Sequence, residues 1–375
     1  MTGALRYKGW RAIRNRLLAS QKFQRWASRF PLTRPIANRR ARALFDICAG
    51  FVYSQVLLTC VRLGLFDLLA EHPKSTQAVS EAVQLPPEST LLLLKAATSL
   101  GLVEKIGDGV WGLGPLGLAM RGNPSIAGFV EHHAMLYGDL EDPVALLRGE
   151  KQDTALGNYW KYAGSPEARA TDEQVARYST LMANSQEMIA DDILDAFDLG
   201  HHKCLLDIGG GEGVFLVRAL NRFDQLRAIL FDLPPVADRA LSRFVDAGLD
   251  NRAAAIGGSF MTDSLPDGAD VISLIRVLHD HHDETVMTVL RAAREALPPG
   301  GTLLVGEPMA GVRGARPIGD AYFGFYLLAM GSGRPRSPQE YDAMLRDAGF
   351  VDVRQARTAR PLLTGLLVAK SPGSK

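Results

Sequence analysis

Residues 205–213 read Leu-Leu-Asp-Ile-Gly-Gly-Gly-Glu-Gly, and this stretch decides the fold class. Two apolar residues lead into an acidic residue, a glycine-rich turn follows, and an apolar run with helical spacing occupies positions 214–220. This order predicts a buried strand, a tight loop and the start of a helix. Glycine lets the backbone of such a loop pass close to a ligand. We therefore expect a cofactor at the carboxyl end of the first strand of an open α/β sheet.

The spacing of this loop differs from that of a dinucleotide-binding loop. Gly209, Gly211 and Gly213 alternate with other residues, whereas the fingerprint G-x-G-x-x-G needs its third glycine at position 214. Glu212 would repel a pyrophosphate but could hold a cation such as an amino group. The pattern D-x-G-x-G-x-G, which begins at Asp207, resembles the first motif of methyltransferases that use S-adenosyl-L-methionine. A strand-to-helix turn without a ligand is the alternative.

From residue 203 onward, predicted strands and helices alternate. The predicted strands are Lys203–Ile208, Arg227–Asp232, Ala253–Gly257, Asp270–Ile275, Thr302–Glu307, Phe350–Ala356 and Leu362–Lys370. This alternation predicts an α/β fold with a mostly parallel sheet that helices cover on both faces. We expect residues 201–375 to form a Rossmann-like catalytic domain that binds the cofactor.

Two further strand ends carry residues suited to a nucleoside. Asp232 ends the second predicted strand, where a carboxylate can accept hydrogen bonds from both ribose hydroxyls. After the third strand, Phe260 could cover an adenine face, with Ser259 hydrogen-bonding beside it. A capping role for Asp232 before Leu-Pro-Pro is the alternative reading.

Residues 276–284, Arg-Val-Leu-His-Asp-His-His-Asp-Glu, follow the fourth predicted strand and concentrate histidines and acids. Their spacing fits neither H-E-x-x-H nor a separated His/carboxylate triad, so we expect no metal site here. A histidine at the carboxyl end of a central strand is well placed for acid–base work over the cofactor crevice. His279 is therefore the candidate general base, and His281 and His282 are expected at the exposed start of the next helix.

The amino terminus is strongly basic, although the whole chain has a formal net charge of only +1. Twelve Lys and Arg residues and no acidic residue precede Asp46, with aromatic side chains such as Trp10 and Trp26 between them. Such a segment can lie on an anionic membrane surface, contact nucleic acid, or form a helical arm that packs on a partner subunit. We expect residues 1–40 to be this basic amphipathic arm.

Other features of the amino-terminal half limit the possibilities. No uninterrupted apolar stretch approaches the ~20 residues that span a bilayer, and no secretory signal is evident. The apolar run around Phe51 and Val52 predicts a helix buried between others. The three cysteines are widely spaced, which argues against a disulfide framework or a zinc site and fits a reducing cytoplasm.

Residues 41–120 are expected to contain a winged-helix-like unit. Helices over residues 75–83 and 88–100 precede two strands around Gly107-Asp108-Gly109. A winged helix can read DNA through its second helix, but here that helix carries four successive leucines and one lysine. We therefore predict packing or dimerisation and no nucleic-acid partner; a winged-helix regulator that senses a ligand is the non-enzyme alternative. Residues 121–200 are expected to form a helical bridge that contributes to a substrate pocket.

Three stretches of the catalytic half carry a specific resemblance. His279-Asp280, Leu297-Pro298-Pro299-Gly300-Gly301 and Val305-Gly306-Glu307-Pro308 are similar to the signature region of the class II O-methyltransferases. That resemblance, which spans roughly residues 40–370, implies a winged-helix dimerisation domain, a Rossmann-like catalytic domain and a metal-independent reaction.

The resemblance also implies roles for individual residues. His279 matches the catalytic base, and Glu307 matches a carboxylate that orients it. Asp232 matches the ribose ligand, and Asp207 to Gly213 match the loop around the methionine moiety. Ser259-Phe260 departs from an Asp-Met pair common in the family. Pro335 stands where plant members carry a second glutamate, so the orienting role would fall to Glu307 with Asp280.

The acceptor is expected to be an apolar alcohol. Candidate pocket residues are Tyr178 and Met182 on a long predicted helix, and Tyr326 and Met330 farther along. Residues 23–57 resemble the carotenoid-pathway branch of the family, which implies a hydroxycarotenoid acceptor methylated at a tertiary hydroxyl. A phenolic or polyketide hydroxyl, or a tetrapyrrole ring carbon, is the alternative. The expected partners are a second copy of the chain in a homodimer and, peripherally, the inner or photosynthetic membrane, with a cytoplasmic location.

Overall fold

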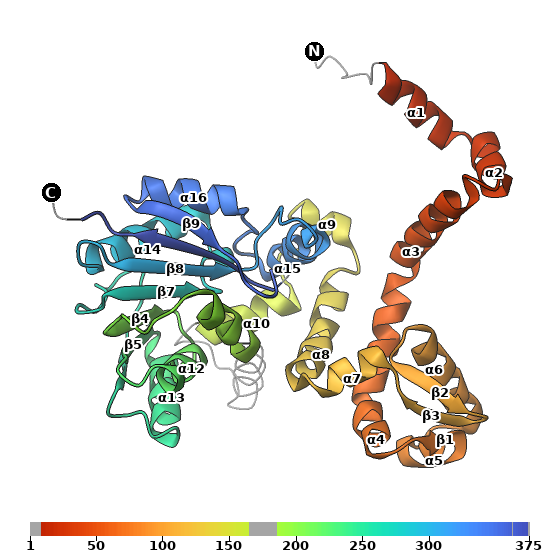
Figure 1. Ribbon diagram of the computed structural model, residues 1–375, viewed down its shortest axis with the longest axis horizontal. Helices are drawn as coiled ribbons and strands as arrows, with labels where there is room; N and C mark the ends of the chain where they lie inside the picture. The colour runs from red at the N-terminus through yellow and green to blue at the C-terminus, as the bar shows by residue number, and fades with distance from the viewer. Residues whose placement is uncertain (1–8, 165–185, 362, 374–375) are drawn as a thin grey trace. The chain divides into compact units, whose positions relative to one another are not determined.

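The computed structural model describes residues 9–361, except 165–185, and residues 363–373. The chain divides into two compact units, Met1–Asn123 and Pro124–Lys375. Figure 1 shows their helices and strands. The long helix α3 (Arg34–Arg62) runs through residue 40 without a break, and no proline follows Pro35 within it. The expected boundary between residues 40 and 41 therefore falls inside a helix.

The first unit combines a helical arm with a small winged helix. Besides α3, its elements are α1 (Trp10–Ala19), α2 (Gln21–Arg29), α4 (Leu65–Glu71), β1 (Lys74–Ser75), α5 (Thr76–Val83), α6 (Pro87–Ser99), β2 (Val103–Gly107), β3 (Val110–Leu113) and α7 (Pro115–Arg121). The strands form a three-stranded antiparallel sheet in the order β1-β3-β2. The predicted helix–turn–helix and hairpin are confirmed.

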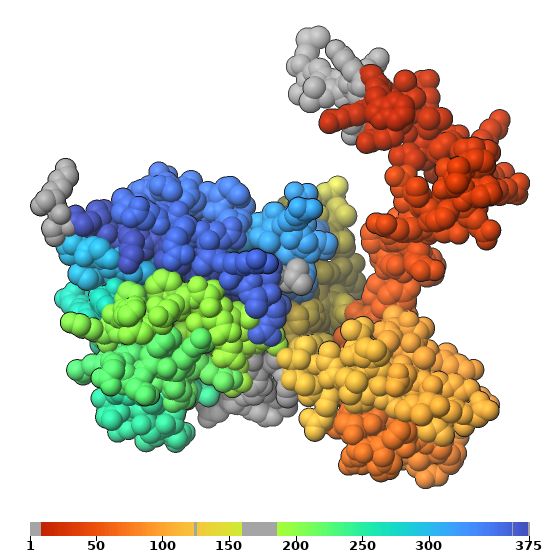
Figure 2. Space-filling view, viewed as in Figure 1, coloured from red at the N-terminus to blue at the C-terminus, as the bar shows by residue number. Residues whose placement is uncertain are grey.

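Much of the apolar surface of this unit is open. Phe51 and Val52 on α3 are 68% and 46% exposed, so the expectation that this run is buried within the chain is wrong. On α6, Leu94 is fully buried but Leu92 is 71% exposed. By length and composition alone, α3 also meets the criterion for a helix that could cross a membrane, a criterion that core helices of soluble proteins meet as well. Figure 2 shows the same unit in a space-filling view, with α1 and α2 in red.

The second unit is a doubly wound α/β domain preceded by helices. Its elements are α8 (Pro124–Asp139), α9 (Pro143–Leu147), α10 (Ala155–Gly164), a helical run over residues 186–196, β4 (Cys204–Ile208), α12 (Val214–Arg222), β5 (Arg227–Asp232), α13 (Pro234–Asp246), β6 (Ala253–Gly257), β7 (Val271–Ile275), the short turn η1 (Leu278–Asp280), α14 (Asp283–Ala296), β8 (Thr302–Glu307), η2 (Pro317–Tyr322), α15 (Phe323–Met330), α16 (Pro338–Asp347), β9 (Val351–Ala356) and β10 (Gly365–Lys370).

The sheet of this unit has seven strands in the order β6-β5-β4-β7-β8-β10-β9. The strands from β6 to β8 pair in parallel, whereas β10 runs antiparallel to both of its neighbours. The mostly parallel sheet predicted from sequence is confirmed. The strand order reverses at β4, which β5 and β7 flank, and ligands of such sheets bind beyond the carboxyl ends of the strands at this point.

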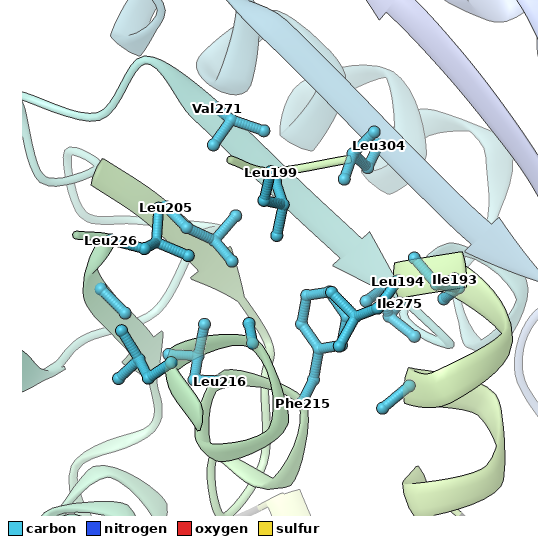
Figure 3. Packing of buried hydrophobic residues seen from close by; sticks show 14 of the residues in the cluster. Ile193, Leu194, Leu199, Leu205, Phe215, Leu216, Leu226, Val271, Ile275 and Leu304 are labelled. Carbon is cyan, nitrogen blue, oxygen red and sulfur yellow. The ribbon is translucent and has the colours of Figure 1, made fainter. Parts of the chain in front are cut away.

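Successive side chains of each strand point to opposite faces of the sheet, so the hydrophobic core has one part on each face. Leu205 packs with α12 and the helical run 186–196, while its neighbour Leu206 packs on the opposite face with α14 and α16. Figure 3 shows the first of these clusters, where Phe215 and Leu216 of α12 meet side chains of β4, β7 and β8. This two-sided core fixes the strand ends that carry the candidate site.

Candidate functional site

The glycine loop lies between β4 and α12 and has an unusual backbone. Gly209, Gly211 and Gly213 have φ angles of +66°, +60° and +77°, which side chains other than glycine rarely adopt. A Cβ at Gly209 would lie 2.8 Å from Val277, whereas a Cβ at Gly211 would meet nothing within 4 Å. The loop is thus packed on one side and open at Gly211, as a loop that approaches a ligand must be.

Two buried carboxylates stand beneath and beside this loop. Ser273 donates a hydrogen bond of 2.6 Å to Asp207, whose other oxygen, Oδ2, is buried without a hydrogen-bond partner. Asp232 accepts bonds from the N–H groups of Gly211 and Leu233, at 2.8 and 2.7 Å. Burial raises the pKa of Asp207 to about 7 and that of Asp232 to about 6.

These groups suit S-adenosylmethionine. The orphaned oxygen of Asp207 can accept a hydrogen bond, and the raised pKa values mean that a cation nearby would relieve two destabilised carboxylates. Asp232 uses one lone pair of each oxygen on backbone N–H groups, which leaves acceptor capacity for a ribose diol. The residues present therefore fit the cofactor: Asp232 would hold the ribose, and the loop would hold the methionine end.

Ser259 and Phe260 follow β6, whose carboxyl end lies beside that of β5. The backbone N–H of Ser259 donates to Asp263 at 2.8 Å, and the ring of Phe260 stands edge-on to His281, with centroids 5.4 Å apart. Both residues are partly exposed, on the same edge of the sheet as Asp232. This placement allows them to contact an adenine.

Glu212 has different partners from those expected. Its carboxylate lies 3.3 Å from Nε of Arg239 and 2.7 Å from Nη2 of Arg243, both on α13. These two guanidinium groups balance the charge of Glu212, so its carboxylate joins the loop to α13. The expected contact of Glu212 with the cofactor's amino group stays a prediction.

The candidate catalytic turn follows β7. His279 is 4% exposed, and its Nδ1 lies 2.6 Å from Oε2 of Glu307 at the end of β8. The other oxygen of the fully buried Glu307 accepts from the backbone N–H groups of Val277 and Leu278, at 3.0 and 2.7 Å. Because a carboxylate only accepts, Nδ1 of His279 carries the proton, and Nε2 is left with its lone pair.

Asp280 flanks the other side of the imidazole. Its Oδ1 lies 3.0 Å from Nε2 of His279 but outside hydrogen-bond geometry, and it has no other partner. Burial raises the pKa of Asp280 to about 6. Burial opposes the charged form of His279, but the carboxylates of Asp280 and Glu307 outweigh it, so the pKa of His279 is raised.

An aromatic wall stands beside the catalytic histidine. Phe323 at the start of α15 meets the His279 ring edge-on at 6.0 Å, and it also packs against Tyr322 and Tyr326. From α8, His132 and His133 hydrogen-bond to the hydroxyls of Tyr326 and Tyr322, at 2.8 and 3.0 Å respectively. Burial lowers the pKa of both histidines, that of His132 to about 4, so neither is charged at neutral pH.

The expected pocket residues are only partly located. Tyr326 and Met330 are 7% and 6% exposed and belong to one packed cluster with Leu136 and Leu156. Tyr178 and Met182 lie outside the described residues.

The site also contains residues that the sequence analysis does not assign to it. Arg276 adopts a positive φ of +58° just before the catalytic turn, and Arg336 is fully buried against that turn. Ser273, the partner of Asp207, stands in the middle of an apolar strand, where an isolated polar residue could have indicated it. Within the described residues, no group of three or more His, Cys, Asp or Glu side chains is arranged to hold a metal ion.

Comparison with known proteins identifies the class. Residues 137–351 match the O-methyltransferase domain model, and residues 45–120 match the O-methyltransferase dimerisation domain model. The chain belongs to the O-methyltransferase family defined by these domains, and its methyl donor is S-adenosylmethionine.

Among individual relatives, the chain is 43% identical to demethylspheroidene O-methyltransferase of Cereibacter sphaeroides, over 95% of this chain and 94% of that one. It is 41% identical to the protein of the same name from Rhodobacter capsulatus, over 95% and 88% of the two chains. Human N-acetylserotonin methyltransferase, solved in complex with S-adenosylmethionine, matches with a TM-score of 0.73 and 25% identity, over 89% of this chain and 98% of that one.

Proposed function

We propose that this enzyme methylates the tertiary hydroxyl of an acyclic hydroxycarotenoid, with His279 as the general base. The observation that carries the acceptor is the similarity to two demethylspheroidene O-methyltransferases at 43% and 41% identity along nearly the whole chain. Since each match spans 95% of the chain, it extends into the basic amino-terminal segment.

The catalytic turn supports the proposed role of His279. The bound cofactor supplies a methyl group on a sulfonium, which leaves as a neutral thioether when the new carbon–oxygen bond forms. Nε2 of His279 takes the hydroxyl proton as that bond forms, a contribution that is typically ~10²–10⁴-fold. Glu307 holds the imidazole in the tautomer that this step needs, at 2.6 Å. The carboxylate of Asp280, 3.0 Å from Nε2, stabilises the imidazolium that results.

A tertiary alcohol is a far weaker acid than a phenol and is harder to deprotonate. The surroundings of His279 favour the removal of such a proton. A phenol can ionise partly without help, whereas an alkyl hydroxyl loses its proton only as the methyl group arrives. A base with a raised pKa accepts such a proton more readily. The carboxylates of Asp280 and Glu307 beside the imidazole of His279 therefore favour the deprotonation of an alcohol acceptor.

The aromatic wall fits an apolar acceptor. Phe323, Tyr322 and Tyr326 offer ring faces and edges, and the polar atoms of the two tyrosines are engaged by His133 and His132. Because those histidines are neutral, they place no charge beside a hydrocarbon chain lying there. We assign Tyr326 and Met330 to the surroundings of the acceptor.

The arm would bring the enzyme to a membrane that dissolves such an acceptor. Trp10 and Trp26 are 73% and 51% exposed, and Trp26 stacks on Phe30 with centroids 5.0 Å apart. Exposed aromatic side chains among basic residues are typical of segments that lie in an anionic lipid interface. We further propose a homodimer formed through residues 41–120, residence in the cytoplasm, and peripheral contact of α1 and α2 with the membrane.

An acceptor panel tests the proposal. The full chain is incubated with labelled S-adenosylmethionine and, separately, with a 1-hydroxy acyclic carotenoid in detergent micelles, N-acetylserotonin and a hydroxyphenazine. The last two are chosen because relatives named acetylserotonin and phenazine O-methyltransferases are 31% and 28% identical to this chain. Label is expected in the carotenoid alone; transfer to a phenol with none to the carotenoid would refute the proposed acceptor.

A further inference from the structure

The backbone carbonyl groups of the catalytic turn all accept hydrogen bonds from one short segment of the chain. The four consecutive carbonyls of residues 278–281 each accept a hydrogen bond from the segment Ser332–Arg336, which we call the clasp. The bonds run from Arg336 Nη1 to the carbonyl of 278 (2.8 Å), from the N–H of Arg334 to 279 (3.0 Å), from the Ser332 hydroxyl to 280 (2.7 Å) and from Arg336 Nη2 to 281 (2.8 Å). Isolated turns leave such carbonyls to water, so this complete pairing fixes the turn.

Arg336 accounts for two of these four bonds and is itself fully buried. Its guanidinium also donates to Asp283, at 2.9 Å from Nε and 2.5 Å from Nη2, and it lies over the ring of Tyr341. A buried cation is costly unless all its donors are used, and here each N–H direction has an acceptor. The planar fork of arginine is suited to hold two carbonyls and a carboxylate at once.

Gly333 allows the clasp to approach the turn. Its φ is +77°, and a Cβ at this position would collide with the carbonyl oxygen of His279 and the backbone of Asp280. Gly331, two residues earlier, has a nearly identical φ of +79°, but a Cβ there would meet nothing within 4 Å. The two glycines therefore have the same backbone geometry, but a side chain would clash with the catalytic turn only at Gly333.

The turn is thus held from two sides. Glu307 engages the N–H groups of Val277 and Leu278 and the imidazole of His279, while the clasp engages the carbonyls. The clasp directly follows α15, which contributes Phe323 to the aromatic wall. The same short stretch of chain therefore joins the wall beside the acceptor to the turn that carries the base.

We propose that the clasp sets the position of the His279 imidazole between Asp280 and Glu307, with Arg336 as its main positioning residue. The inference rests on the proposed role of His279 as the base. Removing the fork, or inserting a methyl group at Gly333, shifts the turn relative to Glu307 and changes how His279 lies beside Asp280, while the glycine loop and Asp232 keep the cofactor in place.

The paired variants Gly333→Ala and Gly331→Ala test this directly. Both place alanine at a positive φ, so both carry the same backbone strain of about 1–2 kcal/mol. A misplacement of the base by about 1 Å costs roughly 10²-fold in rate, so Gly333→Ala should lose about that factor in kcat toward the 1-hydroxy carotenoid. Gly331→Ala should stay within about threefold of wild type, and both should bind S-adenosylhomocysteine as wild type does.

A second readout separates positioning from simple loss of stability. In the complex with S-adenosylhomocysteine, histidine nitrogen NMR follows the titration of His279, assigned by its absence in His279→Gln. Gly333→Ala and Arg336→Lys should lower the pKa of His279, because the imidazole loses its bond to Glu307 and its set position beside Asp280. Arg336→Lys keeps the charge but cannot serve both carbonyls and Asp283 together.

Each outcome decides the matter. An unchanged pKa and an unchanged kcat in both variants would overturn the proposal, as would cofactor binding that is lost in parallel with kcat, which would make the clasp an element of folding only. Turnover that persists in His279→Gln would instead refute the role of the base, and the NMR titration would still report whether the clasp places the ring.

Discussion

Replacing Glu307 with glutamine removes one charge from beneath the catalytic turn and leaves the side-chain volume almost unchanged. In the structure, three donors converge on this carboxylate: the N–H groups of Val277 and Leu278, and Nδ1 of His279. Glutamine offers only one oxygen. If that oxygen serves the two backbone groups, its NH2 group faces Nδ1, which must then accept and leave its proton on Nε2.

The expected magnitude follows from that arrangement. A proton on Nε2 removes the base from the hydroxyl, so kcat should fall by about 10³–10⁴-fold, the upper range of a general base held in the wrong tautomer. If the amide turns instead to keep the Nδ1 bond, the two buried N–H groups lose their acceptor, at a cost of about 1–3 kcal/mol in the free energy of unfolding. Affinity for S-adenosylhomocysteine should remain, because Asp232 and the glycine loop are untouched.

The assay measures transfer of labelled methyl to a 1-hydroxy acyclic carotenoid, with calorimetry of S-adenosylhomocysteine binding and thermal unfolding in parallel. Glu295→Gln, an exposed carboxylate on α14, serves as the matched control and should behave as wild type. The reasoning is refuted if Glu307→Gln retains kcat within about threefold of wild type, because a base that tolerates the wrong tautomer is no general base.

Other perturbations address the remaining parts of the site. The raised pKa of His279 predicts that kcat/KM increases with pH through a value above that of ordinary histidine, and Asp280→Asn should move this ascending limb to lower pH; a limb that stays in place in the pH–rate profile would contradict the pairing. Asp232→Ala should weaken S-adenosylhomocysteine binding by about 100-fold in calorimetry, from the loss of two hydrogen bonds to a charged group, and unchanged affinity would remove Asp232 from the cofactor site. Deleting residues 1–30 should reduce sedimentation with anionic liposomes at low salt, with little effect on neutral liposomes; equal binding would leave the arm as a structural element.

The architecture of the catalytic half could be predicted from sequence because its strands are apolar and bounded by distinct turn residues. Every predicted strand from β4 to β10 is present, with ends that differ by at most three residues. The glycine loop and Asp232 were also found, since they occupy strand ends that any doubly wound sheet brings together. The family resemblance assigned Glu307, and the structure places it 2.6 Å from the histidine.

The features that could not be predicted from the sequence depend on contacts between residues that are far apart in the chain. Glu212 is paired with Arg239 and Arg243, which follow it by about thirty residues, and nothing in the loop itself indicates these partners. Nothing near Arg336 in the sequence shows that its side chain lies against a turn 55 residues earlier. The exposed apolar face of α3 was expected to be buried, since periodicity shows that a face is apolar and cannot show what covers it.

The central claim is that His279 deprotonates the hydroxyl of an apolar alcohol acceptor. The most direct test compares wild type with His279→Ala on a 1-hydroxy acyclic carotenoid, with product detected as the methyl ether by mass spectrometry and S-adenosylhomocysteine binding measured on the same samples. We predict ether formation by wild type, and for His279→Ala a loss of about 10²–10⁴-fold in turnover with cofactor affinity retained. Equal turnover by the two proteins, or no methyl ether from wild type, would contradict the account.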